Sequence, residues 1–214
     1  MPVENDVRHI PVVGRPRANP GAALPSKPGQ AGPGNINAPV SQLPDVKPGP
    51  KRALSRDIDV GLGDIRSGKA NDDKETTNAG KTRIVTGIGH VVMYLTGKNV
   101  RATYAEAKPA TDEILAAYSR RPSADVKEVV AGVNSYLQNI VVYDFLLARA
   151  AADSTRLDDA LEIAKEYVTD AGPDSRARTD RLESMIVAMK DAGVSQPIRN
   201  ATRMACEKAI RSKP

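Results

Sequence analysis

From Thr82 onward, apolar residues recur every three or four positions, which is the spacing of one face of an α-helix. The pattern divides into segments at about 82–95, 103–120, 124–152, 155–171, 174–192 and 195–211. Ser, Thr, Gly and Pro stand at the borders of these segments, where helices are capped or ended. The sequence therefore predicts an all-α compact domain of five or six helices.

Two of these segments carry residues that oppose a regular helix. Gly87 and Gly89 weaken the first one, and its β-branched residues leave a strand as an alternative. In the second, Thr103 and Glu106 have the spacing of a capping box. Pro109 follows in the same segment, and we expect it to kink or restart the helix.

Residues 1–81 have a different composition from the rest of the chain. Eleven of the 16 prolines fall in residues 1–50, and all seven aromatic residues lie at or after Tyr94. Such a segment buries too little apolar surface to offset its chain entropy. We therefore expect residues 1–81 to form a long extended or disordered arm and residues 82–214 a helical core with a short basic C-terminal tail. The mildly apolar stretch at 58–65 is predicted to be a docking strand or a short helix.

The net charge of +5 is concentrated in the arm, because residues 1–56 carry eight basic and three acidic side chains. A basic arm suits a polyanion or an acidic partner surface, and simple solubility is an equal alternative. The single cysteine, Cys206, excludes a disulfide within the chain. The apolar runs are short and interrupted by charges, so no membrane partner is expected.

Catalytic patterns are incomplete in this sequence. Gly80-Lys81-Thr82 looks like the end of a phosphate-binding loop, but Glu75 stands where that loop requires glycine. The only histidines are His9 and His90, and His90 is expected to be a satisfied, half-buried core residue. Metal-ligand residues are not clustered. We therefore expect a protein that is not an enzyme and that uses no cofactor and no metal.

One residue breaks the apolar stripe of the segment 124–152, for which Ser123 is the expected cap. The stripe consists of Val126, Val130, Val133, Leu137, Ile140, Val141, Leu147 and Ala151, and Asp144 falls on it. A buried carboxylate needs a partner. Upstream candidates are Arg101, Arg120 and Arg121, and the alternative is a change of register that exposes Asp144.

Arg101 stands at the start of a predicted helix, and Tyr143-Asp144-Phe145 follows with the aspartate 43 positions later. In this respect residues 98–149 resemble the core of the coat proteins of flexible filamentous RNA viruses, the potyvirus- and potexvirus-like group. The resemblance implies that Arg101 contacts RNA phosphates and that Asp144 orients it. It also makes Ser67 the counterpart of the family's upstream serine near the RNA. Arg149, one turn beyond Asp144, completes the predicted RNA-binding set.

The leading hypothesis is a structural coat or nucleoprotein subunit of a virion assembled in the host cytoplasm. It would polymerise into a helical filament through the arm and hold genomic RNA by sequence-independent phosphate contacts. The alternative is a bacterial exported effector or adaptor with a disordered secretion region and a helical partner-binding domain. In that case Asp144 is only one member of a buried ion pair.

Overall fold

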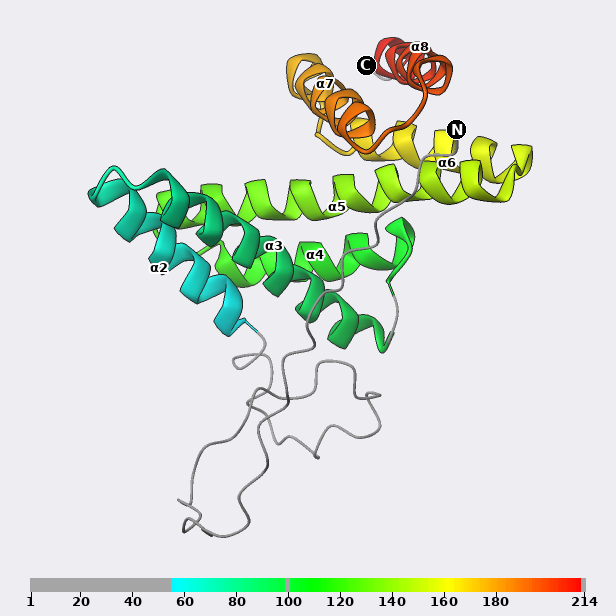
Figure 1. Ribbon diagram of the computed structural model, residues 1–214. Helices are drawn as coiled ribbons and strands as arrows, with labels where there is room; N and C mark the ends of the chain where they lie inside the picture. The colour runs from blue at the N-terminus through cyan, green and yellow to red at the C-terminus, as the bar shows by residue number, and fades with distance from the viewer. Residues whose placement is uncertain (1–54, 99–100, 213–214) are drawn as a thin grey trace, which may run out of the picture. The chain divides into compact units, whose positions relative to one another are not determined.

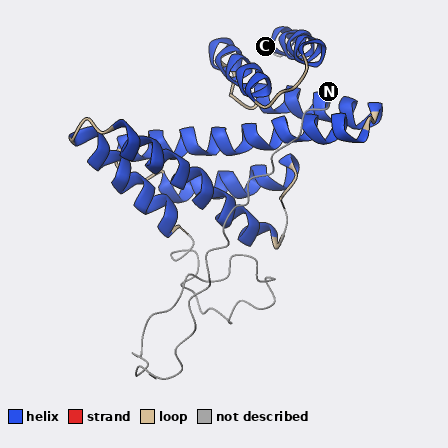
Figure 2. Ribbon diagram, in the orientation of Figure 1, coloured by secondary structure: helices blue, strands red, loops and turns tan. Residues whose placement is uncertain are grey.

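The computed structural model describes residues 55–98 and 101–212, and all regular structure in these ranges is α-helical (Figures 1 and 2). The seven helices of this part are α2 (Arg56–Ala70), α3 (Lys74–Thr96), α4 (Tyr104–Tyr118), α5 (Ser123–Ala151), α6 (Ser154–Thr169), α7 (Ser175–Asp191) and α8 (Gln196–Ser212). The predicted all-α class is confirmed, and the count exceeds the expected five or six. None of these helices is long and apolar enough to cross a membrane.

The boundary predicted between arm and helical domain, at 81/82, is wrong. Helix α2 lies entirely within the expected arm, and its residues Ile58, Leu62 and Ile65 are buried. They recur every three or four positions, so the stretch at 58–65 is one face of a core helix. The helical domain thus includes residue 56 onward, and the remainder of the predicted arm, residues 1–54, lies outside the described residues.

Helices α2 and α3 form an antiparallel pair in which glycines allow the backbones to approach closely. A Cβ atom at Gly61 would stand 2.7 Å from the carbonyl oxygen of Gly80. A Cβ atom at Gly87 would stand 2.9 Å from the amide nitrogen of Ile58. The pair therefore packs through contacts of glycine with backbone and isoleucine side chains, without any aromatic residue of α2.

Helix α3 begins eight residues before the predicted start. The Asp73 side chain accepts hydrogen bonds from the backbone N–H groups of Glu75 and Thr76, at 3.0 and 3.1 Å. This cap satisfies donors that would otherwise lack a partner at the helix N-terminus. The helix continues past Gly87 to Thr96 and ends at Gly97, whose φ of 66° is left-handed. The strand alternative for this segment is excluded.

Helix α4 has the predicted capping box between Thr103 and Glu106, and it runs without interruption past Pro109. Helix α5 begins one residue earlier than expected, with Pro122 rather than Ser123 in the N-cap position. The predicted restart at Pro109 and the predicted Ser123 cap are both wrong, and the alternative of a kink at Pro109 stays a prediction.

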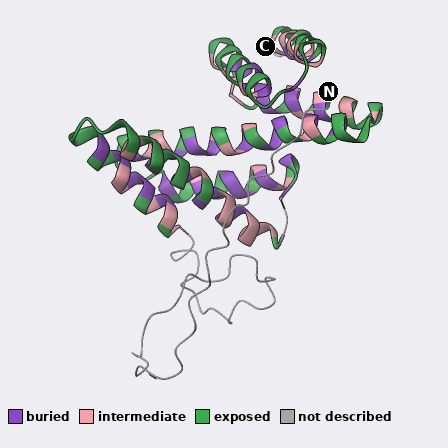
Figure 3. Ribbon diagram, in the orientation of Figure 1, coloured by how far each residue is buried: buried purple, intermediate pink, exposed green. Residues whose placement is uncertain are grey.

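The buried face of α5 is only partly the one predicted. Val133, Leu137, Ile140 and Val141 are buried as expected, and Val129 and Phe145 are buried in addition. Val130 and Leu147, in contrast, are 38% and 40% exposed. Helix α5 packs against α3, α4, α6 and α7, so helices on more than one side cover it. Its exposed and buried residues are shown in Figure 3.

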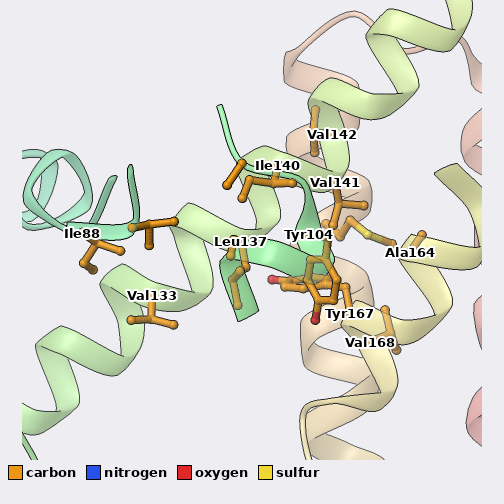
Figure 4. Close-up of a cluster of buried hydrophobic side chains, with 14 of the residues drawn as sticks. Ile88, Tyr104, Val133, Leu137, Ile140, Val141, Val142, Ala164, Tyr167 and Val168 are labelled. Carbon is orange, nitrogen blue, oxygen red and sulfur yellow. The ribbon is translucent and has the colours of Figure 1, made fainter. Parts of the chain in front are cut away.

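Tyr104 of α4 and Tyr167 of α6 join the two parts of the core. Their rings meet edge to face with centroids 6.2 Å apart (Figure 4). The Tyr104 hydroxyl donates a hydrogen bond of 2.9 Å to Asp170, just beyond α6. Leu137 and Val141 of α5 lie beside this pair in the same cluster.

The predicted basic C-terminal tail is, up to Ser212, the packed helix α8. Its buried residues Thr202 and Cys206 belong to the side that faces α6 and α7. Arg203 pairs with Glu183 of α7. The basic residues of this segment therefore belong to a packed helix, where Arg199 and Arg203 are half-buried and Lys208 and Arg211 are exposed.

Candidate nucleic-acid interface

Arg101 and Asp144 meet in the structure, although 43 residues separate them in the sequence. Nη2 of Arg101 lies 3.8 Å from Oδ1 of Asp144, and the two side chains are 30% and 27% exposed. Arg101 precedes α4, and Asp144 lies in the second half of α5. The carboxylate that breaks the apolar stripe is thus half-buried and has an arginine from another segment as its partner.

Three further contacts hold the Arg101 guanidinium on the surface of α5. Nη2 donates a hydrogen bond to the carbonyl oxygen of Ile140 and a longer one, of 3.4 Å, to that of Asn139. The guanidinium carbon lies 4.1 Å from the centre of the Tyr143 ring, which is a cation–π arrangement. The arginine is therefore fixed in place by backbone and ring contacts as well as by Asp144.

Arg101 lines a groove between α3 and α5 with a volume of about 470 Å³. The lining is mostly apolar or uncharged and comprises Val85, Thr86, Gly89, His90, Met93, Arg101, Tyr136, Asn139, Ile140 and Tyr143. Tyr143 is 45% exposed at this surface. Arg101 is thus the only Lys or Arg among these lining residues, and none of them is Asp or Glu.

Burial disfavours the charged form of both members of the pair. Burial raises the pKa of Asp144, and the nearby positive charge of Arg101 opposes this shift. It lowers the pKa of Arg101, and Asp144 opposes that shift in turn. Each charge therefore compensates for the desolvation of the other. An additional anion in the groove would stabilise the arginine further.

The arginine keeps donors for such an anion. A guanidinium has five N–H donors in a planar fork, which matches the oxygens of a phosphate. Within the described residues, only Nη2 of Arg101 takes part in hydrogen bonds. The described part of the chain therefore makes no hydrogen bond to Nε or Nη1 of this positioned side chain.

The other two predicted RNA-binding residues are not part of this groove. Ser67 lies at the end of α2, where Gly68 packs against Thr77 of α3. The groove begins at Val85, which is eight residues after Thr77 along α3. At the helical rise of 1.5 Å per residue, these two residues are about 12 Å apart along the helix axis. Arg149 donates a hydrogen bond of 2.8 Å to the carbonyl oxygen of Gly193 between α7 and α8. Of the four predicted RNA-binding residues, the structure therefore brings together only Arg101 and Asp144.

Three lining residues of the groove were not predicted from the sequence to belong to a binding site: His90, Tyr136 and Asn139. The prediction that His90 is half-buried and satisfied is confirmed, because its Nδ1 lies 3.2 Å from Oδ2 of Asp57. Asn139 and Tyr143 are four residues apart, next to the buried stripe of α5. A search for exposed polar residues one helical turn from Tyr143 would have found Asn139.

Cys206 and the carboxylates of α6 show no arrangement typical of catalysis. Cys206 is fully buried, and burial raises the pKa of its thiol to about 12. The carboxylates of Asp158, Asp159, Glu162 and Glu166 are on the exposed side of α6. In the described part of the chain, no three His, Cys, Asp or Glu side chains gather in a way that could hold a metal ion.

Comparison with known proteins adds no family to these observations. No protein-family model matches the sequence, and no curated protein or solved structure matches the chain. The functional argument therefore rests on the residues and geometry described above.

Proposed function

We propose that this chain is a structural coat or nucleoprotein subunit that binds single-stranded RNA through phosphate contacts in the Arg101 groove. The observation that carries the proposal is the meeting of Arg101 and Asp144 at a concave surface. This is the pair that the resemblance of residues 98–149 to coat proteins of flexible filamentous RNA viruses implies.

The groove suits binding that does not depend on nucleotide sequence. Phosphates are identical at every position of a strand, so a guanidinium that contacts them carries no sequence information. Arg101 is the only Lys or Arg in the lining, so it is the lining residue that can pair with a phosphate charge. A subunit that coats a whole genome needs this tolerance.

In this proposal, residues 1–54 link neighbouring subunits of a helical filament, and the particle is a virion assembled in the host cytoplasm. The arm is basic, with seven Lys or Arg side chains against three acidic ones in residues 1–54. A basic strap suits a subunit packed close to RNA, because it offsets the charge of the polyanion. Deletion of residues 1–54 tests this role without removing any part of α2.

Absorbance and negative-stain microscopy of the purified full chain test the proposal. The chain has no Trp and six Tyr, so its own absorbance at 280 nm is low and bound RNA dominates at 260 nm. We expect RNA-containing filaments from the full chain and only short or globular particles from residues 55–214. A monomeric full chain that carries no nucleic acid and binds none at low salt would contradict the proposal and favour the exported adaptor.

A further inference from the structure

A second hollow continues the Arg101 groove along the seam between α3 and α5. It has a volume of about 250 Å³ and includes Lys81 of α3 and Ser135 of α5. Val85 lines both this hollow and the Arg101 groove. The two concave surfaces therefore adjoin, with Arg101 in one and Lys81 in the other.

The seam is long because α3 and α5 run alongside each other in the same chain direction. Gly132 lies against Ile84, and four residues further along α5 Tyr136 lies against Gly89. On the exposed side of the seam, α5 presents Ala131, Ser135 and Asn139, at intervals of four residues. Along this edge of α5, the path between the two cations is therefore lined by uncharged side chains.

Acidic residues lie beside both cations of this path, because Glu128 lines the second hollow with Lys81 and Asp144 pairs with Arg101. Asp57 of α2 contacts His90 between them. The sequence of α5 has no acidic residue between Glu128 and Asp144, and that of α3 has none after Glu75. Glu128 itself, at the edge of the second hollow, forms an ion pair of 2.7 Å with Lys69.

Lys81 supplies a charge at the end of the seam opposite Arg101. It is exposed, and within residues 55–98 and 101–212 it forms no ion pair. Gly80, directly before it, packs against the carbonyl oxygen of Gly61 in α2. The sequence Gly80-Lys81-Thr82 therefore lies inside a helix, with its glycine used for packing and its lysine facing solvent.

We propose that Lys81 is a second phosphate-contacting residue and that a single nucleic-acid strand follows the α3–α5 seam from Lys81 to Arg101. This inference rests on the proposed binding of RNA at the Arg101 groove. From Lys81 to Met93 the seam is about 18 Å long by the helical rise. Phosphates of a helical strand are 3.4 Å apart along the axis and those of an extended strand about twice as far, so the seam spans roughly three to five nucleotides.

Fluorescence anisotropy with an oligouridylate of eight nucleotides tests this path on the full chain. At about 50 mM salt, Lys81→Ala should weaken binding roughly five- to tenfold and reduce the slope of log K against log salt by about 0.7. Lys81→Arg, which keeps the charge, should bind within about twofold of wild type. Lys190→Ala is the matched control, because it removes the same charge from an exposed position on α7.

The outcomes separate this inference from the proposed function. If wild type binds RNA and Arg101→Ala weakens binding while Lys81→Ala does not, the path is wrong and the Arg101 site stands. Equal losses in Lys81→Ala and Lys190→Ala would also overturn the path, because they would reflect net charge alone. If wild type binds no RNA at low salt, the proposed function fails together with the path.

Discussion

Gly132 of α5 lies so close to Ile84 of α3 that a Cβ atom at position 132 would stand 2.5 Å from Cγ2 of Ile84. Ile88 would stand 3.0 Å away on the same side. Both isoleucines are buried, and a β-branched side chain in a helix has little rotamer freedom to move aside. This contact sets how near the two helices approach at the floor of the seam.

Gly132→Ala should therefore destabilise the fold. Overpacking costs about 1–3 kcal/mol, which exceeds the gain of up to about 1 kcal/mol that alanine brings to a helix interior. Urea unfolding followed by circular dichroism measures the free energy of unfolding.

Gly63→Ala is the matched control for this substitution. Gly63 lies inside α2, and a Cβ atom there would meet no heavy atom within 4 Å. The free energy of unfolding should rise by about 0.5–1 kcal/mol. If Gly132→Ala stabilises the protein as much as Gly63→Ala does, the close approach of α3 and α5 is wrong.

The sequence was informative where local chemistry decides the structure. The capping box of Thr103 and Glu106 needs only residues within one turn, and it is present. A carboxylate on an apolar stripe must find a cation wherever the chain supplies one. For this reason the pairing of Asp144 with an upstream arginine was predictable without knowledge of the packing.

The sequence was misleading where packing between distant segments decides the structure. Helix α2 looked too polar and too poor in aromatics for the core, and only the approach of Gly61 to Gly80 shows how it packs there. No sequence pattern indicated that Ser67 lies far from Arg101, because the distance between them depends on how α2 and α3 pair. The exposure of Leu147 likewise depends on where the other helices pack around α5, which the sequence of α5 does not show.

Glu106 should make the stability of the domain depend on acid pH. Its hydrogen bonds with Lys98 and with the backbone N–H of Thr103 lower the pKa of its carboxyl from 4.5 to about 2. Because this pKa is lower in the folded state, the ionised Glu106 carboxylate stabilises the fold at pH values above about 4.3, the pKa of a glutamate in the unfolded chain. This stabilisation is lost as the pH falls toward 2.

Glu106→Gln should accordingly lower the free energy of unfolding at pH 7, and its difference from wild type should shrink between pH 5 and pH 2. Chemical denaturation at several pH values measures this difference. NMR titration of the Glu106 carboxyl carbon reports its pKa directly. A Glu106 that titrates near 4.5 in the folded protein would be inconsistent with the capping box and the Lys98 contact.

The most direct measurement of the central claim is the affinity of Arg101→Ala for a labelled oligouridylate, compared with wild type and with Arg120→Ala. Arg120 is exposed, forms no ion pair within the described residues and does not line the groove, so its removal controls for net charge. Circular dichroism establishes that each variant is folded, and Arg101→Lys separates loss of charge from loss of the guanidinium contacts.

We predict that wild type binds with an affinity that falls linearly on a log–log plot against salt. Arg120→Ala should stay within about twofold of wild type. Arg101→Ala should lose about tenfold or more at 50 mM salt, since both a phosphate contact and the ordered guanidinium disappear. Wild-type affinity in a folded Arg101→Ala, or equal losses in the two alanine variants, would contradict the assignment of this groove to RNA.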